Sequence, residues 1–334
     1  MSLGIHKPLV EYYNLTGTPY FTLAFVLYSS VYNGPAWAGS IPLDAFVDEV
    51  KELREAGGGD VIIAFGGAVG PYLCQQAKTP EQLAQWYIQV IDTYNATYLD
   101  FDIEAGVDAD KLADALLILQ KERPSVRISF TLPSDPGAGL VGSGYSIIQT
   151  MVQKGVVIDR VNPMTMDYYW TPANADNAIS VAEHVFKQLK QIYPDKSDDE
   201  IWGMIGLTPP MIGTNDDKSV FSLQDAEKLV DWAIQYRIRS LAFWSVDRDH
   251  PGPTGEVSPI HRGNQRPPRL GLQPRLPEVH EGIPAGCQHG SGGSCSSSLT
   301  PLFSSFVHNE IGETAKEAES FPPQVCPTSG ILPR

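Results

Sequence analysis

Hydrophobic and polar residues follow two different periods along the chain. Short apolar runs, such as residues 20–28 and 60–67, are bounded by Gly, Pro and Asn, which is typical of buried strands. Longer stretches, such as residues 43–56, place apolar side chains every three to four positions, which predicts helices that bury one face. The other predicted strands are 98–104, 127–132, 160–167, 201–207 and 240–245, and the other predicted helices are 8–14, 79–94, 108–121, 147–154, 175–193 and 223–236.

The order of these elements indicates a parallel sheet. Strands and helices alternate from residue 20 to residue 245, as expected for crossover helices in either a doubly wound sheet or a closed barrel. Glu104, Asp167 and Asp247 lie where predicted strands end, and barrel active sites lie at that rim. The Gly-rich turn at 65–70 lacks the spacing of a dinucleotide-binding loop. The sequence therefore favours an α/β fold, a TIM-type (β/α)8 barrel.

The predicted barrel is incomplete at both ends. The pattern contains seven strands, because the chain starts in the helix that should follow the first strand, and the last helix is also missing. We divide the chain into residues 1–261, an incomplete (β/α) barrel, and residues 262–334, a low-complexity, disordered tail rich in Pro, Gly and Ser. Strands 20–28 and 240–245 are then expected to pair directly or to form exposed edges. We expect poor activity or low stability in consequence.

Composition and charge limit the kinds of molecule that the protein is expected to bind. Of the 334 residues, 42% are hydrophobic and 19% charged, which suits a globular core. The net charge of −15 argues against a nucleic-acid or anionic-membrane partner and favours a neutral polymer or a small molecule. No apolar run is long enough to span a membrane, and the N-terminus lacks a secretory pattern. The four cysteines are too irregularly spaced for a zinc site and too few for a disulfide scaffold, so the compartment stays undecided.

The candidate chemistry lies in the strand at 98–104. Successive strand residues point to opposite faces, so Asp100, Asp102 and Glu104 share one face and apolar residues occupy the other. Three carboxylates in a row repel each other unless some keep their protons, which indicates a site and not a stabilising feature. Two alternatives are a solvent-facing acidic strand and a calcium site. Calcium loops, however, space their ligands around a Gly-containing turn.

These features resemble glycoside hydrolase family 18, the chitinases and their relatives. Residues 99–104 (LDFDIE) resemble its DxxDxDxE signature, residues 64–67 (AFGG) its SxGG strand, residues 164–168 (MTMDY) its MxYD-type strand and Trp244 its final-strand tryptophan. The resemblance covers residues 7–260 and is greatest to the bacterial chitinase-D-like branch. Thr97, Ala64 and Met166 depart from the family pattern, which affects the expected rate more than the reaction type.

The resemblance implies retaining hydrolysis in which the substrate's acetamido group is the nucleophile. Glu104 would be the general acid, Asp102 would orient the acetamido group, and Asp100 would share a proton with Asp102. Trp244 would form the floor beneath the sugar, and Met164 would belong to the same binding site. Asp167 with Tyr168 or Tyr169 would hydrogen-bond the acetamido group. No metal or other cofactor is implied.

The implied substrate is chitin or an N-acetylglucosamine oligosaccharide. Two alternatives stay open: an endo-β-N-acetylglucosaminidase acting on N-glycans, and a catalytically weak or dead, lectin-like chitin-binding protein. Trp37, Trp170 and Trp202 fit either core packing or a sugar subsite, and the sequence does not separate the two.

Overall fold

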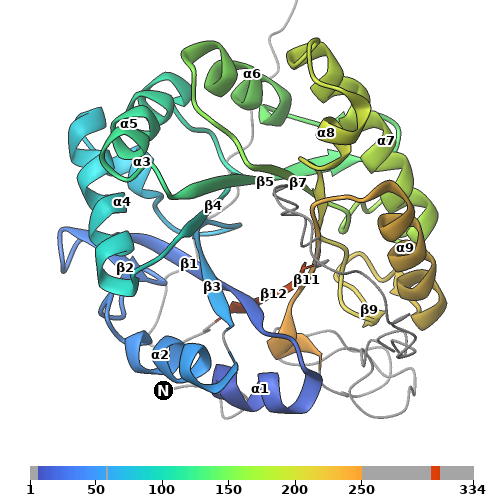
Figure 1. The fold of residues 1–334 in the computed structure, drawn as a ribbon, viewed down its shortest axis with the longest axis horizontal. Coiled ribbons are helices and arrows are strands. Elements are labelled where there is room, and N and C mark those ends of the chain that lie inside the picture. The colour runs from blue at the N-terminus through green and yellow to red at the C-terminus, as the bar shows by residue number, and fades with distance from the viewer. Residues whose placement is uncertain (1–6, 58, 250–301, 309–334) are drawn as a thin grey trace, which may run out of the picture.

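A closed ring of parallel strands surrounds the centre of the molecule (Figure 1). The computed structural model describes residues 7–57, 59–249 and 302–308. Within them, ten strands form one sheet; β2 (Gly34–Trp37) and β6 (Gly139–Leu140) pair antiparallel, and the other eight build the ring. In order around it they are β1 (Tyr20–Ser29), β3 (Asp60–Gly66), β4 (Tyr98–Asp102), β5 (Arg127–Asp135), β7 (Arg160–Met164), β8 (Gly206–Leu207), β11 (Ser240–Trp244) and β12 (Leu302–His308). Parallel bridges, Val161 to Ile205 and Met164 to Thr208, close it between β7 and β8.

Helices form the outer layer because those after β1 lie in the connections between parallel strands, and the helices bury apolar side chains against the barrel (Figure 1). They are α1 (Leu9–Thr16), α2 (Val47–Gly57), α3 (Leu73–Gln76), α4 (Pro80–Tyr94), α5 (Ala109–Glu122), α6 (Gly144–Lys154), α7 (Ala175–Ile192), α8 (Asp198–Trp202) and α9 (Leu223–Tyr236), with a 3-10 turn η1 (Val246–Arg248). Helix α4 starts at its predicted cap, where Thr79 Oγ1 accepts the Gln82 N–H at 3.2 Å. In the described ranges, no helix is long and apolar enough to cross a membrane.

A strand from the C-terminal tail occupies the gap expected in the barrel. β12 lies between β1 and β11 and pairs parallel with both, with Ser304 opposite Tyr20 on one side and Ala242 on the other. The prediction that β1 and β11 pair directly or stay open is therefore wrong, because residues 302–308 lie between them. The segment LFSSFVH has no sustained alternation, so its strand conformation depends on partners remote in sequence. The rest of the predicted tail lies outside the described residues.

The predicted strand at 201–207 is largely wrong. Ser197 and Glu200 form a capping box that starts α8, so Ile201 and Trp202 are helical and only Gly206–Leu207 remain as β8. A short apolar run alone does not distinguish a strand from a helical turn. The hairpin of β9 (Gly213–Thr214) and β10 (Val220–Phe221), which precedes α9, also has no counterpart among the predicted elements.

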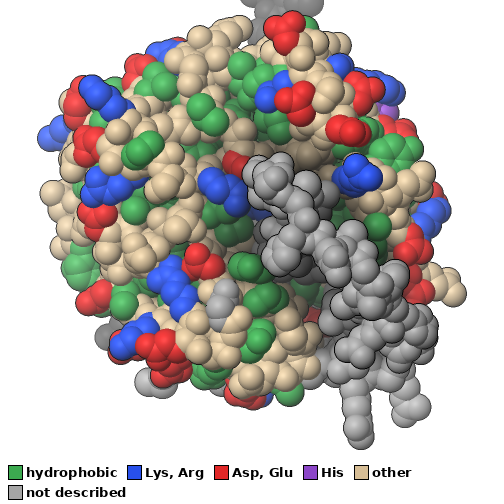
Figure 2. All heavy atoms as spheres, viewed as in Figure 1, with side chains coloured by type: hydrophobic (Ala, Val, Ile, Leu, Met, Phe, Trp, Pro, Cys, Tyr) green, Lys and Arg blue, Asp and Glu red, His purple; other side chains and the backbone are tan. Residues whose placement is uncertain are grey.

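The barrel wall separates an apolar outer layer from a polar interior. On β4, Leu99 and Phe101 face the helices, and the Phe101 ring stacks on Phe65 with centroids 5.4 Å apart. The buried polar side chains of the interior hydrogen-bond to one another; they are Asp100, Ser129, Thr131, Arg160, Asn162 and Ser240. On the outer surface seen in Figure 2, basic and acidic side chains are interspersed.

Candidate active site

Asp100 lies in the barrel interior with partners from two neighbouring strands. It is fully buried and accepts hydrogen bonds from the Ser129 hydroxyl and, at 2.7 Å, from Thr131 Oγ1 of β5. Arg160 of β7 places Nη2 3.6 Å from the Asp100 carboxylate, and its Nη1 donates to Ser240 Oγ of β11 at 2.9 Å. A buried charge requires such partners. The network therefore gives both carboxyl oxygens of Asp100 a hydrogen-bond partner beneath the rest of the site.

Asp102 is the next inward-facing residue of β4. Its side chain is 5% exposed, and Oδ1 has no hydrogen-bond partner among the described residues. Burial raises the pKa of the Asp102 carboxyl well above its usual range, and the charges of Glu104 and Asp100 raise it further. Asp102 therefore favours its protonated form and retains an oxygen that a bound ligand can use.

Glu104 lies beyond the end of β4, at the open end of the barrel, where solvent reaches its side chain. Partial burial and the charge of Asp167 nevertheless raise the pKa of the Glu104 carboxyl above its ordinary value. A carboxyl group with a raised pKa can hold a proton near neutral pH and transfer it to a leaving group. The three predicted carboxyl groups thus lie in order from the barrel interior to its open end. The innermost, Asp100, has hydrogen-bond and arginine partners, whereas Asp102 Oδ1 has none among the described residues.

Asp167 faces the same opening from the end of β7. Its φ of 53° lies in the left-handed region, which is uncommon for residues other than Gly and is often found at functional sites. Burial raises the pKa of Asp167 to about 6, and the charges of Asp216 and Asp217 add to this, while Arg248 opposes it. The charge of Asp167 is also one of the two causes of the raised pKa of Glu104, so the two carboxyl groups lie within electrostatic reach of each other. The third strand-end carboxylate, Asp247, instead accepts the Tyr12 hydroxyl of α1 at 3.4 Å.

The β9–β10 hairpin brings further charged residues to Asp167 that sequence reasoning missed. Asp216 and Asp217 lie in its turn, and Arg248 of η1 holds Asp216 through two hydrogen bonds of 2.9 Å. Arg248 is 6% exposed, so this bidentate pair is a well-fixed link between the hairpin and the end of β11. The only signal in the sequence was the turn-like run Asn215-Asp216-Asp217-Lys218, which by itself indicates a solvated loop.

The neighbouring tyrosines are separated by the fold. Tyr168 is 8% exposed, and burial raises the pKa of its hydroxyl above the ordinary value, so it stays neutral. Tyr169 is 75% exposed and has a φ of 62°, so the chain turns its side chain outward. Met164, which ends β7, is half-buried, and its carbonyl oxygen accepts the Ser134 hydroxyl at 2.6 Å. Of the two alternatives, Tyr168 is the tyrosine that lies inside the barrel wall.

The tryptophans have different environments. Trp244 is half-buried at the end of β11 and stacks on Phe25 of β1, with centroids 5.6 Å apart and ring planes 25° apart. Trp37 is 2% exposed and donates to the Tyr94 hydroxyl at 2.8 Å, and Trp202 stacks on Phe186, so both contribute to packing. Trp170 is 66% exposed, and its Nε1 donates to Asp135 Oδ2 at 2.9 Å.

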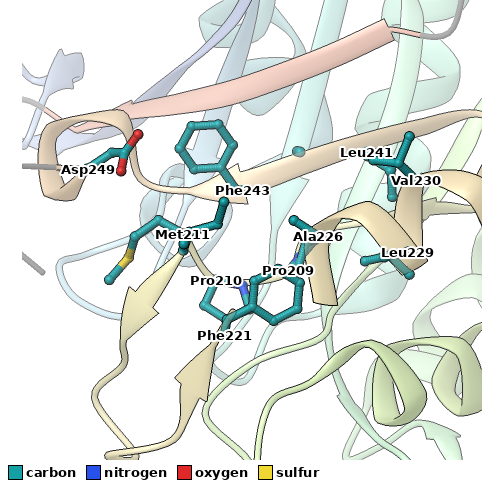
Figure 3. Close-up of a pocket in the computed structure, with 12 residues that line it drawn as sticks. Pro209, Pro210, Met211, Phe221, Ala226, Leu229, Val230, Leu241, Phe243 and Asp249 are labelled. Carbon is teal, nitrogen blue, oxygen red and sulfur yellow. The ribbon is translucent and has the colours of Figure 1, made fainter. Parts of the chain in front are cut away.

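An apolar pocket with about 470 Å³ of open space lies elsewhere, beside β11 (Figure 3). Leu241 and Phe243 line it from β11, and Leu229 lines it from α9. None of the three stacked carboxylates contributes to its wall. It is therefore a gap in the outer apolar layer, distinct from the candidate site.

The acidic residues of the site do not form a metal-binding arrangement. In the residues that the structure describes, no group of three or more His, Cys, Asp or Glu side chains is placed to hold a metal ion. Asp100 and Asp216 instead have arginine partners, which supply the positive charge near each.

We expect Asp167→Asn to stabilise the fold at pH 7. An Asp carboxyl ordinarily titrates at 3.8, and in the folded protein the pKa of Asp167 is about 6, so its ionised form disfavours folding above pH 6. The gain in the free energy of unfolding should be about 1–3 kcal/mol at pH 7. Below about pH 4 the carboxyl is protonated in both states, and the gain should vanish. Urea unfolding at both pH values measures this, with Asp231→Asn on the exposed face of α9 as control; an equal gain at pH 4 would contradict the electrostatic origin.

Comparison of the sequence with known proteins identifies two relatives that are named as chitinases. The chain is 35% identical over 267 residues to the probable bifunctional chitinase/lysozyme of Escherichia coli K12. It is 34% identical over 252 residues to endochitinase 11 of Metarhizium anisopliae. These matches cover 73% and 70% of this chain but 29% and 48% of the relatives, so the chain spans less than half of the length of each. No protein-family model matches the chain.

Solved structures extend the comparison and confirm the predicted TIM-type barrel. The catalytic domain of the hyperthermophilic chitinase from Pyrococcus furiosus is 80% identical, with a TM-score of 0.77, over 80% of this chain and 88% of that one. Catalytic-site mutants of that chitinase domain have also been solved in complex with chito-oligosaccharides. A family 18 chitinase from Pseudoalteromonas aurantia shares the fold at 18% identity and a TM-score of 0.53, over 75% of this chain and 93% of that one.

Proposed function

The chain belongs to glycoside hydrolase family 18, and from this membership we propose that it hydrolyses β-1,4-linked N-acetylglucosamine polymers with retention of configuration. The observation that carries the proposal is the buried pair Asp100 and Asp102 directly beneath Glu104, with a raised pKa at Asp102 and at Glu104. A binding protein has no need of such a destabilising stack of acids. The chitinase names of the relatives support the same substrate class.

Glu104 protonates the glycosidic oxygen in the proposed reaction. Its raised pKa supplies the proton near neutral pH, and its place at the opening lets a polymer reach it from outside. Departure of the leaving group leaves positive charge on the sugar ring. The acetamido carbonyl oxygen of the same sugar attacks the anomeric carbon, so no carboxylate of the protein is needed as nucleophile. Water then opens the cyclic intermediate, with Glu104 acting as base.

Asp102 orients the acetamido group and stabilises the cation that it forms. The free Oδ1 of Asp102 can accept the acetamido N–H, and its proton can pass to Asp100 when negative charge is needed beside the intermediate. Arg160, 3.6 Å from Asp100, supplies a counter-charge at the base of the barrel. The pair therefore changes its charge distribution during the reaction without moving the backbone.

The walls of the site would fix the sugar above these groups. Trp244, backed by Phe25, offers an aromatic face to the C–H groups of the ring at the scissile bond. In the proposed reaction, Asp167 and the Tyr168 hydroxyl hydrogen-bond the acetamido group from the β7 side, and Met164 belongs to the same binding site. Tyr169 and Trp170, exposed at the rim, are available to neighbouring sugars.

The experiment that tests the proposal compares three substrates. Purified protein is incubated with fluorogenic chitobiose and chitotriose glycosides, with an N-glycosylated protein, and with insoluble chitin. We expect fluorophore release and soluble chitobiose, and NMR of the fresh product should show the β-anomer first. Release of N-glycans without chitobioside cleavage would instead identify an endo-β-N-acetylglucosaminidase. Binding to chitin with no soluble product would identify a lectin-like protein, and inactivity on all three would reject the proposal.

A further inference from the structure

We propose that Tyr72 is a positioning residue for Glu104: its hydroxyl connects the backbone of Glu104 to the turn after β3 and so determines where the carboxyl group points. The inference rests on the proposed function, because that function makes Glu104 the general acid. Tyr72 lies just before the short helix α3, outside all the motifs identified in the sequence.

The connection is a continuous series of three hydrogen bonds. The Glu104 N–H donates to the Tyr72 hydroxyl at 3.2 Å, and the hydroxyl donates to the Gly67 carbonyl oxygen at 2.6 Å. The Gly67 N–H in turn donates to the Asp102 carbonyl oxygen at 3.0 Å. The series starts at Glu104 and ends at Asp102. It therefore fixes the backbone on both sides of Ile103.

The position needs such a support because the sheet ends before Glu104. β4 stops at Asp102, and the Ile103 N–H donates to the Thr131 carbonyl oxygen at 3.0 Å on the β5 side. On the β3 side the approach is so close that a Cβ on Gly66 would lie 1.9 Å from the Asp102 carbonyl oxygen. Only glycine permits this contact, and Gly66 has a φ of 101°. The turn after β3 therefore lies close enough to β4 for one tyrosine side chain to bridge them.

Helix α3 makes a second connection to the same segment. Gln75 Oε1 accepts the Tyr72 N–H at 3.2 Å, and Gln75 Nε2 donates to the Gly106 carbonyl oxygen at 3.0 Å. Tyr72 and Gln75 thus hold residues 104–106 at two points. The inner point is buried, whereas Gln75 is exposed, so the tyrosine should contribute most of the restraint.

The Tyr72 hydroxyl is suited to a permanent role as donor and acceptor. Tyr72 is 4% exposed, and burial raises its pKa to about 12, so the proton stays on the oxygen throughout the working range. A small cavity of about 20 Å³ adjoins it, lined also by Cys74, Tyr87 and Asp102. Without the hydroxyl, the Glu104 N–H loses its partner, and this space permits residues 103–106 to shift or water to enter.

The test is Tyr72→Phe, with Tyr87→Phe as matched control. Tyr87 lines the same space and packs on Phe101, but within the described part of the chain it has no hydrogen bond to the site. We expect Tyr72→Phe to lower kcat on a chitotriose glycoside about ten- to a hundredfold, because small displacements of a catalytic group reduce rates by this order. KM should change less than about twofold, since the variant keeps the buried aromatic ring and all the proposed sugar-binding side chains. Tyr87→Phe should retain the wild-type kcat. Gln75→Ala, a change at an exposed residue, should lower kcat in the same direction by less.

Amide hydrogen exchange tests the same connection without turnover. The Glu104 amide should exchange about tenfold faster in Tyr72→Phe than in wild type and be unchanged in Tyr87→Phe. If wild type is active and Tyr72→Phe keeps its kcat, or if its Glu104 amide exchanges as in wild type, the inference is overturned. If wild type cleaves no chito-oligosaccharide, the proposed function fails, and amide exchange alone then decides whether Tyr72 holds Glu104.

Discussion

Glu104→Gln should lower kcat on chito-oligosaccharides about a hundred- to ten-thousandfold, the range typical of a lost general acid. The amide keeps the size of the side chain but cannot donate a proton to the glycosidic oxygen. The alkaline limb of the rate profile should also change. In wild type, kcat falls as pH rises through the raised pKa of Glu104, and in the variant this limb should disappear.

Binding separates a catalytic from a structural role for Glu104. We expect the dissociation constant for chitotriose in Glu104→Gln to stay within a few-fold of wild type, because Trp244, Asp167 and Tyr168 are unchanged. Glu183→Gln, the same chemical change on the exposed face of α7, is the control for altered net charge. Wild-type turnover in Glu104→Gln would mean that the stacked carboxylates are structural, and loss of binding would mean that Glu104 holds the sugar.

Arg160→Met should lower the free energy of unfolding by about 3–5 kcal/mol, the usual effect of removing one partner of a buried ion pair. Arg160 is 2% exposed and lies 3.6 Å from the fully buried Asp100, so the variant leaves a carboxylate in the interior without its cation. The surrounding wall is shaped for the arginine: a Cβ on Gly206 would lie 2.8 Å from Arg160 Cδ and from Ser240 Oγ. Urea unfolding at pH 7 measures the loss.

A double-mutant cycle identifies the cause of that loss. Asp100→Asn removes the charge that Arg160 balances, so the double variant should be less destabilised than the sum of the two single variants. Arg160→Lys keeps the charge without the two-armed geometry and should be intermediate. Strict additivity, or a loss below about 1 kcal/mol in Arg160→Met, would show that the arginine contributes packing and little electrostatic stabilisation.

The barrel type and the central acids could be predicted because both depend on local spacing. A period of two residues places Asp100 and Asp102 on one face of a strand whatever surrounds it, and regular alternation with helices requires parallel strands. The strand predicted at 160–167 ends earlier, at Met164, so Asp167 lies in the segment that follows β7 and not within the strand. Which of Tyr168 and Tyr169 points inward was not predictable, because the left-handed backbone at Asp167 and Tyr169 breaks the alternation.

Other predictions failed where local and tertiary preferences differ. The short apolar run at 201–207 is compatible with either a strand or a helix. The capping box formed by Ser197 and Glu200 starts the helix α8, which takes in the first residues of this run. β12 is the opposite case: a segment with no strand pattern pairs with β1 and β11 because both offer unpaired backbone groups. Backbone partners thus outweighed side-chain pattern in closing the barrel.

The α/β barrel, the order of its strands from β1 to β11 and the acids at 100, 102 and 104 could be predicted from periodicity, because the period gives the direction of each side chain relative to its own backbone. The partners of the acidic residues became visible only in the folded chain: Arg160 beside Asp100, Asp216 and Arg248 near Asp167, and Tyr72 against the Glu104 backbone. Such contacts join residues from about 30 to 60 positions apart. Their formation depends on which strands become neighbours and how closely these strands approach. Local periodicity carries no information on contacts between residues so far apart in the sequence.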